Sequence, residues 1–172
     1  MIALYHGTTL EVAEPLVRVG RKMVDFGQGF YLTKLKRQAS LWAETIAERR
    51  TSGSPIVNRY EFDIDAAKVQ CGSRYKVFGS YDLEWLDYVI DCRRGGKLQR
   101  QYDVVEGGVA NDKVIDTVED YEKGVITAEQ ALGQLAYKEV NHQLAILSQP
   151  VIDAFLTFRG SSPVKSKGGH HA

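Results

Sequence analysis

Residues 25–33 read Asp-Phe-Gly-Gln-Gly-Phe-Tyr-Leu-Thr, a stretch that predicts a tight turn leading directly into a short aromatic strand. Its two glycines permit the turn, and its aromatic residues favour extended backbone. In residues 34–50, apolar side chains recur at three- and four-residue steps, which is typical of an amphipathic helix with Thr33 as its N-cap. A turn, a strand and a helix in immediate succession predict a fold in which helices and strands are mixed.

Shorter elements are expected on both sides of this segment. Strands are predicted at residues 1–5, 56–64, 68–71, 102–105, 142–147 and 156–158. Helices are predicted from a cap at Ser80 to about Arg93, from a cap at Asn111 or Asp112 to Gly124, after the capping box Thr127-Ala128-Glu129-Gln130, and at residues 149–155. Residues 10–19 are expected to be irregular because Pro15 interrupts them. This order lacks the alternation of a doubly wound sheet and so predicts the α+β class.

The length of 172 residues indicates one globular domain. Hydrophobic residues make up 44% and charged residues 26%, so the chain can bury a core, and intrinsic disorder is excluded as its main state. We expect the domain to span residues 1–159. Residues 160–172 contain Ser, Pro, Lys and Gly and end in Gly-Gly-His-His-Ala, a composition that predicts a disordered tail.

The charges balance, with 22 Lys and Arg against 22 Asp and Glu, so no overall attraction to nucleic acid or anionic membranes is expected. No apolar run approaches the roughly 20 residues that span a bilayer, and the first residues do not form a signal peptide. We therefore expect a cytoplasmic protein without a membrane partner. Cys71 and Cys92 stand far apart without nearby histidines, which predicts reduced thiols. No metal is expected, since the adjacent His170 and His171 cannot complete a coordination sphere alone.

Four separate segments place polar or aromatic side chains next to predicted strands. They are residues 5–8 (Tyr-His-Gly-Thr), 25–33, 102–112 and 141–146. Taken alone, each has an ordinary structural explanation: a loop histidine, a core aromatic residue, turn and cap residues, or a polar strand residue. Single residues therefore decide nothing, and their order along the chain carries the information.

Together, the four segments resemble the ADP-ribosyltransferase superfamily. The most similar part of it is a bacterial family of small, largely uncharacterised domains, with an Asp-x-Val-x-Gly-x-x-Ala-Asn-Asp segment met here by residues 103–112. That family also has a late Asn-x-Gln strand, met here by residues 141–146. The resemblance runs from Leu4 to about Phe158, and residues 25–33 are its most specific piece.

The resemblance implies two small, mostly antiparallel sheets that face each other across an NAD cleft, with flanking helices. His6 and the Thr8 hydroxyl would hydrogen-bond ribose hydroxyls near the adenosine end. The ring of Tyr31 would stack on the cationic nicotinamide, with a cation–π component of about 0.5–2 kcal/mol. The residues expected to contact NAD are His6, Gly7, Thr8, Gly27, Gly29, Phe30, Tyr31 and Thr33.

The implied activity is mono-ADP-ribosyl transfer, with Gln143, Tyr31 and His6 as catalytic residues. The bond between ribose and nicotinamide breaks and leaves an electron-poor ribose that an anion would stabilise. Best-known members carry a glutamate where this chain has Gln143, which is uncharged and cannot act as a base. Gln143 therefore only positions the ribose, or an acid such as Glu106, Asp103 or Asp112 supplies the charge, or the protein binds NAD without turnover.

The resemblance also implies a toxin held in check by an antitoxin, or a protein of conflict between bacteria and phages. The acceptor of ADP-ribose is then a protein, a nucleic acid or a small molecule. A rival interpretation is a nucleic-acid-binding module, motivated by the basic clusters at residues 34–37, 49–50 and 93–94. Salt-dependent RNA binding in the absence of NAD would favour that rival.

Overall fold

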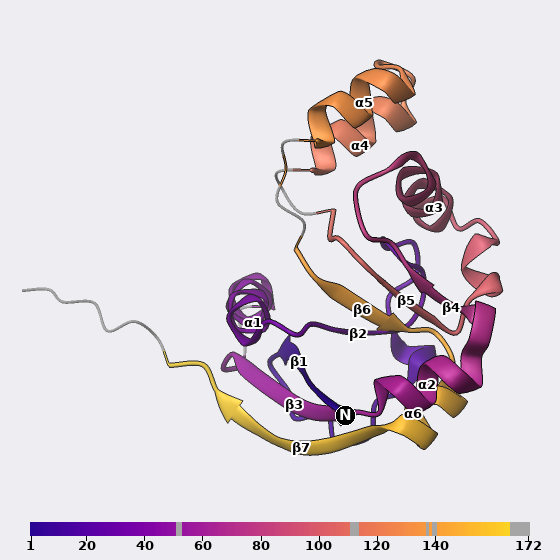
Figure 1. Ribbon diagram of the computed structural model, residues 1–172. Helices are drawn as coiled ribbons and strands as arrows, with labels where there is room; N and C mark the ends of the chain where they lie inside the picture. The colour runs from indigo at the N-terminus through magenta and orange to yellow at the C-terminus, as the bar shows by residue number, and fades with distance from the viewer. Residues whose placement is uncertain (51–52, 111–113, 137, 139–140, 166–172) are drawn as a thin grey trace, which may run out of the picture. The chain divides into compact units, whose positions relative to one another are not determined.

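The computed structural model describes residues 1–50, 53–110, 114–136, 138 and 141–165. The chain forms two compact units (Figure 1). Unit 1 comprises residues 1–14, 32–62 and 156–172, and unit 2 comprises residues 15–31 and 63–155. Within the described ranges, no helix is long and apolar enough to cross a membrane.

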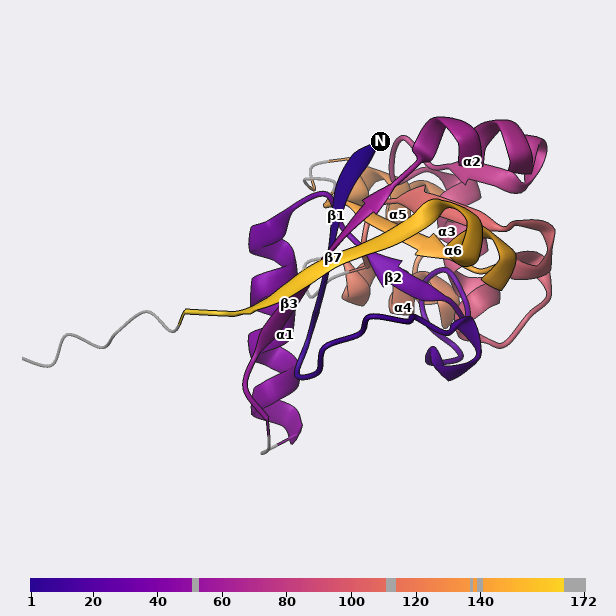
Figure 2. The same cartoon turned by 90° about the horizontal axis from the view of Figure 1, so that it is seen from below.

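Unit 1 contains an antiparallel sheet of three strands in the order β1-β3-β7. These strands are β1 (Ile2–Thr8), β3 (Ile56–Phe62) and β7 (Leu156–Pro163), and β7 runs along β3 (Figure 2). Helix α1 (Lys36–Arg50) packs against β1 and β3. The close approach requires glycine at position 7, because a Cβ there would lie 1.9 Å from the carbonyl oxygen of Ala39 in α1.

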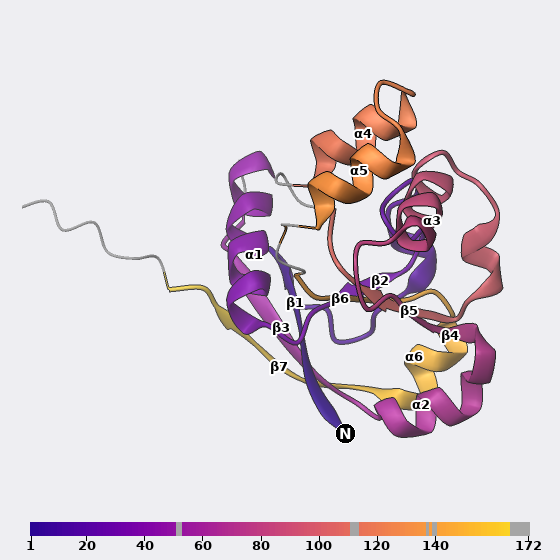
Figure 3. The ribbon, with the colours of Figure 1, turned by 45° about the horizontal axis from the view of Figure 1, so that its top comes forward.

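Unit 2 is built on a four-stranded sheet in the order β2-β6-β5-β4. The strands are β2 (Phe30–Leu32, whose last residue begins the next stretch of unit 1), β6 (Gln143–Ile146), β5 (Val104–Gly107) and β4 (Tyr75–Val77). Strands β5 and β6 pair antiparallel, and β4 and β5 pair parallel. Helix α3 (Leu83–Arg93) lies against one face of this sheet (Figure 3).

The remaining helices of unit 2 are short. They are α2 (Ile64–Cys71), α4 (Ile115–Glu122), α5 (Ala128–Leu135), α6 (Gln149–Phe155) and 3-10 turns at Val17–Val19, Gly72–Arg74 and Leu98–Gln101. Helices α4 and α5 pack on each other, as do α2 and α6.

Aromatic side chains form much of the core of unit 2. The ring of Phe26 lies 6.2 Å from Phe78 and 6.1 Å from Tyr88, and Trp85 is fully buried. Burial of each such ring contributes on the order of 1.5–3 kcal/mol to folding. Because Phe26 belongs to the turn before β2, this core fixes the position of that turn.

The structure confirms the α+β class with two small sheets. The predicted helix at 34–50, the strands at 56–64 and 142–147, the aromatic strand after the turn and the helix at 149–155 are all present, as are a helix ending near Gly124 and the Thr127 capping box. Of residues 10–19, expected to be irregular, 10–16 contain no helix or strand, whereas Val17–Val19 form a 3-10 turn. Cys71 and Cys92 are free, buried thiols.

Several element boundaries were predicted wrongly. Residues 68–71 belong to α2 instead of a strand, because the Asp63 carboxylate accepts the Ala66 N–H and begins a helix. The cap of α3 is Asp82, which accepts the Trp85 N–H, and not Ser80. Thr33 precedes the start of α1 by three positions, and its hydroxyl accepts the Leu35 N–H instead of capping the helix.

Three strands differ in extent from the prediction. Strand β1 continues through residues 6–8, expected as a loop, because these residues pair with β3. Strand β5 begins and ends two residues later than expected. Strand β7 continues through Gly160 to Pro163, past the point where the tail was expected, because it pairs along β3 after a bulge at Arg59/Tyr60. The predicted caps Asn111 and Asp112, and the two tail histidines, lie outside the described residues.

Candidate functional site

The candidate site in unit 2 is centred on the Asp25 carboxylate. Arg93, the last residue of α3, donates from Nε and from one terminal nitrogen to Asp25 Oδ1, at 2.9 and 2.7 Å. The backbone N–H of Ala110 donates to Asp25 Oδ2 at 2.9 Å. Charge-assisted bonds of this kind are about twice as strong as neutral ones, so the carboxylate is held firmly in place.

Gln143 reaches the same carboxylate from the first position of β6. Its Nε2 donates to Asp25 Oδ2 and to the carbonyl oxygen of Gly108, both at 3.4 Å. Asp25 and Gln143 are each only 8% exposed, so these contacts are shielded from solvent. Gln143 pairs with Gly107 across the sheet, on the face where Val105 and Ala145 contact the core.

The loop after β5 is fixed by side chains of the α3 region. Trp85 Nε1 donates to the carbonyl of Gly108 at 3.1 Å, and the Tyr81 hydroxyl donates to the carbonyl of Val109 at 2.8 Å. Together with the bond from Ala110 to Asp25, these contacts hold the loop against Gln143. The candidate site is therefore preorganised.

Tyr31 shapes the turn that carries Asp25. Its hydroxyl donates to the carbonyl of Gly27 at 2.6 Å and accepts the Phe26 N–H at 3.0 Å. The hydroxyl is therefore committed to the backbone, and the ring packs against the hydrophobic core of unit 2. Burial raises the pKa of Tyr31 well above its usual value, and the hydrogen bond from Phe26 only partly opposes this shift.

Packing within unit 2 already requires glycine at positions 27 and 29. Gly27 has φ of +89°, and a Cβ there would lie 1.9 Å from Gln99 Oε1. A Cβ on Gly29 would lie 2.7 Å from the carbonyl oxygen of Ile146 in β6. The adjacent Phe30 is buried. These contacts account for the glycines without a ligand, whereas the approach of NAD to them stays a prediction.

The other predicted NAD-binding residues belong to unit 1. His6 is half-buried in β1 opposite Asn58, and Thr8 is buried at the end of the same strand. Thr33 is buried and exchanges two backbone hydrogen bonds with Tyr5. Gln143 therefore contacts the turn that Tyr31 shapes, and both belong to unit 2. His6, Gly7, Thr8 and Thr33 belong to unit 1.

Of the three acids considered as a source of charge, the two that the structure describes, Glu106 and Asp103, form no hydrogen bond with Gln143. Glu106 lies in register with Leu144, so its side chain projects from the opposite face of the sheet, where it accepts hydrogen bonds from Tyr75 and His142. Asp103 is paired with Arg74. Asp112 lies outside the described residues.

The carboxylate that does contact Gln143 is Asp25, and neither it nor Arg93 was assigned this role from the sequence. Asp25 stands within the quoted stretch, but a turn aspartate gives no signal of its partner. Arg93 was considered only as part of a basic cluster, and its neighbour Arg94 is paired with Glu122. Both arginines of that cluster are therefore engaged with carboxylates, which weakens the interpretation as a nucleic-acid contact.

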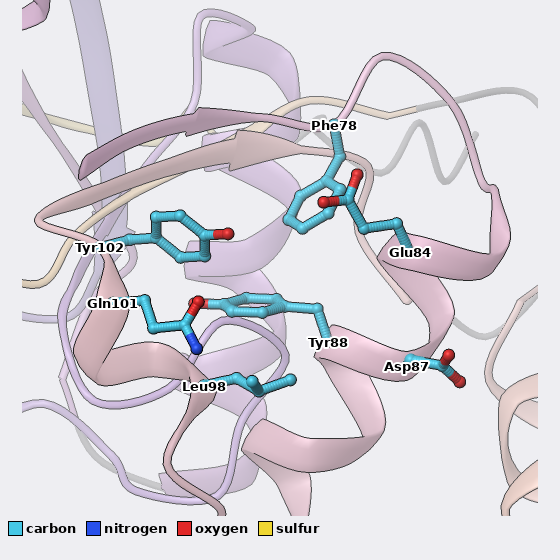
Figure 4. A pocket seen from close by; sticks show the side chains of 7 residues that line it. All are labelled: Phe78, Glu84, Asp87, Tyr88, Leu98, Gln101 and Tyr102. Carbon is cyan, nitrogen blue, oxygen red and sulfur yellow. The ribbon is translucent and has the colours of Figure 1, made fainter. Parts of the chain in front are cut away.

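A hollow of about 240 Å³ in unit 2 does not coincide with this site (Figure 4). Its lining comprises Phe78, Glu84, Asp87, Tyr88, Leu98, Gln101 and Tyr102. Three of its polar side chains already have partners: Glu84 pairs with Lys76, Asp87 accepts from Tyr121, and the Tyr88 hydroxyl donates to the carbonyl of Phe26. Nothing in this hollow calls for a particular ligand.

Buried phenols and a buried thiol predict a loss of stability at alkaline pH. Burial raises the pKa values of Tyr31, Tyr75 and Tyr88, and raises the pKa of Cys92 to about 12. The folded state therefore binds these protons more tightly than the unfolded chain does. The resulting stabilisation is complete at pH values below the pKa values of the unfolded chain, about 8.5 for Cys and 10 for Tyr. As the pH rises above those values, the free energy of unfolding should fall by up to about 1.4 kcal/mol per pH unit for each group.

The measurement is the melting temperature by circular dichroism between pH 7 and 11. The melting temperature of Tyr31→Phe should fall less steeply as the pH rises, because this variant lacks one of the buried phenols. A melting temperature that stays constant up to pH 11 would contradict the burial of these groups.

Comparison with known proteins gives a family and no further relatives. No similar curated protein and no similar solved structure was found. The model of one protein family, described as a protein of unknown function (DUF3990), matches residues 2–158. Since this match covers most of the chain, the protein belongs to the DUF3990 family.

Proposed function

We propose that this protein is an NAD-dependent mono-ADP-ribosyltransferase. One observation supports the proposal most: Gln143 contacts Asp25, although 118 positions separate them in the sequence. These residues belong to the late glutamine strand and to the 25–33 stretch, the two parts of the chain to which the superfamily resemblance assigns the nicotinamide end of NAD. Their contact within unit 2 is what a shared binding site requires.

The reaction transfers the ADP-ribosyl group from NAD to a nucleophilic N–H or O–H of an acceptor. The bond from the ribose C1′ to the nicotinamide nitrogen breaks, its electron pair leaves with neutral nicotinamide, and a bond from C1′ to the acceptor forms. The acceptor releases one proton to solvent. Gln143 positions the ribose through a hydrogen bond, while Tyr31 stacks its ring on the nicotinamide.

The remaining roles concern unit 1 and the setting of the reaction. His6 and Thr8 hydrogen-bond ribose hydroxyls at the adenosine end of NAD. The reaction takes place in the bacterial cytoplasm without a metal or membrane, as part of a toxin–antitoxin or phage-conflict system. Incubation of a bacterial extract with the protein and labelled NAD, followed by mass spectrometry, identifies the acceptor. No labelled product, together with no nicotinamide release, would leave an NAD-binding module as the function.

Replacement of Tyr31 should test the stacking role. Tyr31→Ala is expected to weaken NAD binding by about 1–2 kcal/mol, which is roughly 5- to 30-fold in Kd, because the ring face is lost. Isothermal titration calorimetry with NAD measures this change.

Tyr31→Phe is the matched control. It loses the same two hydrogen bonds to Phe26 and Gly27 but keeps the ring, so its Kd should stay within about threefold of the wild type. Equal weakening in both variants would assign the effect to the turn and not to stacking. Absence of NAD binding by the wild type would overturn the proposed function itself.

A further inference from the structure

The neighbours of Gln143 determine the orientation of its carboxamide. Its Nε2 lies 3.4 Å from Asp25 Oδ2 and 3.4 Å from the carbonyl oxygen of Gly108. Both of these atoms are hydrogen-bond acceptors, so only the amide nitrogen can face them. Its Oε1 accepts no hydrogen bond from any residue that the structure describes. Gln143 therefore presents an acceptor, and not a donor, on the side away from Asp25.

Asp25 places a negative charge directly beside this amide. Its Oδ1 takes both bonds from Arg93, and its Oδ2 accepts from Ala110 and Gln143. The side chains of Asp25 and Arg93 are only 11% and 25% exposed, so solvent screens the charge weakly. A carboxylate at position 143 would face Oδ2 with no proton between the two groups, and like charges at that distance repel.

We propose that Asp25 is a positioning residue that turns the oxygen of the Gln143 amide toward the ligand. Its charge is also the reason why position 143 holds a glutamine instead of a glutamate. Gln143 Oε1 accepts a hydrogen bond from a ribose hydroxyl as a carboxylate oxygen would. The negative charge lies on Asp25, on the other side of the Gln143 amide. The identity of this ligand rests on the proposed function, whereas the coupling between the two side chains does not.

Exchange of the charge between the two positions tests this coupling. Q143E and D25N are each expected to lower the melting temperature by about 5 °C or more, the first by repulsion and the second by leaving Arg93 unpaired. The double variant D25N/Q143E again contains one carboxylate and one amide. The melting temperature of the double variant should therefore lie above the value expected if the two losses simply added. Recovery should stay incomplete, because the Gly108 carbonyl faces the new carboxylate and the Ala110 N–H faces the amide nitrogen that D25N introduces.

Two matched variants control for unspecific effects. E122Q removes the carboxylate that pairs with Arg94, the residue next to Arg93, at a more exposed position. Q101E makes the same change as Q143E on an exposed glutamine of unit 2. Both should shift the melting temperature by no more than about 2 °C.

A kinetic readout separates positioning from stability. The carboxamide introduced by D25N can donate as well as accept, so it no longer fixes the amide of Gln143. At a temperature where D25N is folded, its kcat for nicotinamide release should fall about tenfold or more, while its KM for NAD changes less than about threefold. An unchanged kcat in folded D25N would overturn the positioning role.

The outcomes distinguish this inference from the proposed function. Melting losses that simply add in the double variant overturn the inference, even if NAD is cleaved. Recovery in the double variant supports it, even if the wild type cleaves no NAD and the proposed function fails. If none of the variants folds, hydrogen exchange of the Gln143 side-chain amide in the wild type decides: slow exchange supports the fixed orientation, and fast exchange overturns it.

Discussion

Gln143→Ala is expected to slow nicotinamide release from NAD on the order of 100-fold, the usual cost of removing one hydrogen-bonding group that acts in a transition state. The variant loses the amide oxygen that, in the proposed reaction, would accept a bond from the ribose hydroxyl. Asp25 keeps its bonds to Arg93 and Ala110, so the fold should persist. Nicotinamide release by chromatography and a melting curve of the same sample measure both effects.

The pH profile adds a second readout to this prediction. Glutamine does not titrate, so the rate should lack an acidic limb caused by position 143. Gln101→Ala, a change on an exposed glutamine of the same unit, is the control and should keep the melting temperature of the wild type. A wild-type rate in Gln143→Ala would remove this residue from the mechanism and make Asp25 the first candidate.

Elements with a strong local signal could be predicted from the sequence. Helix α1 follows from its apolar spacing, and α5 follows from the capping box, in which Thr127 and Gln130 bond each other's backbone. Helix α2 lacked such a signal because Ile64 and Val69 are β-branched and favour strands. Its start depends on one cap at Asp63, which a pattern of apolar residues does not reveal.

Strand boundaries that depend on distant pairing could not be predicted. Residues 160–163 are small and polar, so they suggest a tail when considered alone. They form a strand because β3 offers its edge, with a bulge that adjusts the register. In the same way, His6 to Thr8 looked like a loop but belong to β1, which continues along β3.

The candidate site could likewise be predicted only in part from the sequence. The sequence indicates Gln143 and Tyr31 because they stand in recognisable segments. The contacts that hold Gln143 could not be predicted from the sequence, because Asp25 binds Arg93 and Ala110, which are 68 and 85 positions away along the chain. The sequence offers 22 Lys and Arg residues and nothing that selects Arg93 among them. Tertiary packing determines which arginine pairs with Asp25, because it places the end of α3 on the same face of the sheet as Gln143.

Growth of a bacterial host should reveal the proposed activity as toxicity. Induced expression of the wild type is expected to arrest or strongly slow growth, because the proposed ADP-ribosylation, if uncontrolled, would modify an essential acceptor and consume NAD. Tyr31→Ala and His6→Ala should permit nearly normal growth at equal protein level. Growth curves after induction, with protein amounts checked by immunoblotting, measure the difference.

Tyr31→Phe makes this prediction specific for the aromatic ring of Tyr31. It loses the hydrogen bonds to Phe26 and Gly27 as Tyr31→Ala does, but keeps the stacking surface, so it should remain toxic. A protein that burdens the cell by aggregation would slow growth most in the less stable variants, which is the opposite order. If the wild type and all three variants grow alike, the toxin role fails, and a transferase with a metabolic substrate or a silent NAD-binding module takes its place.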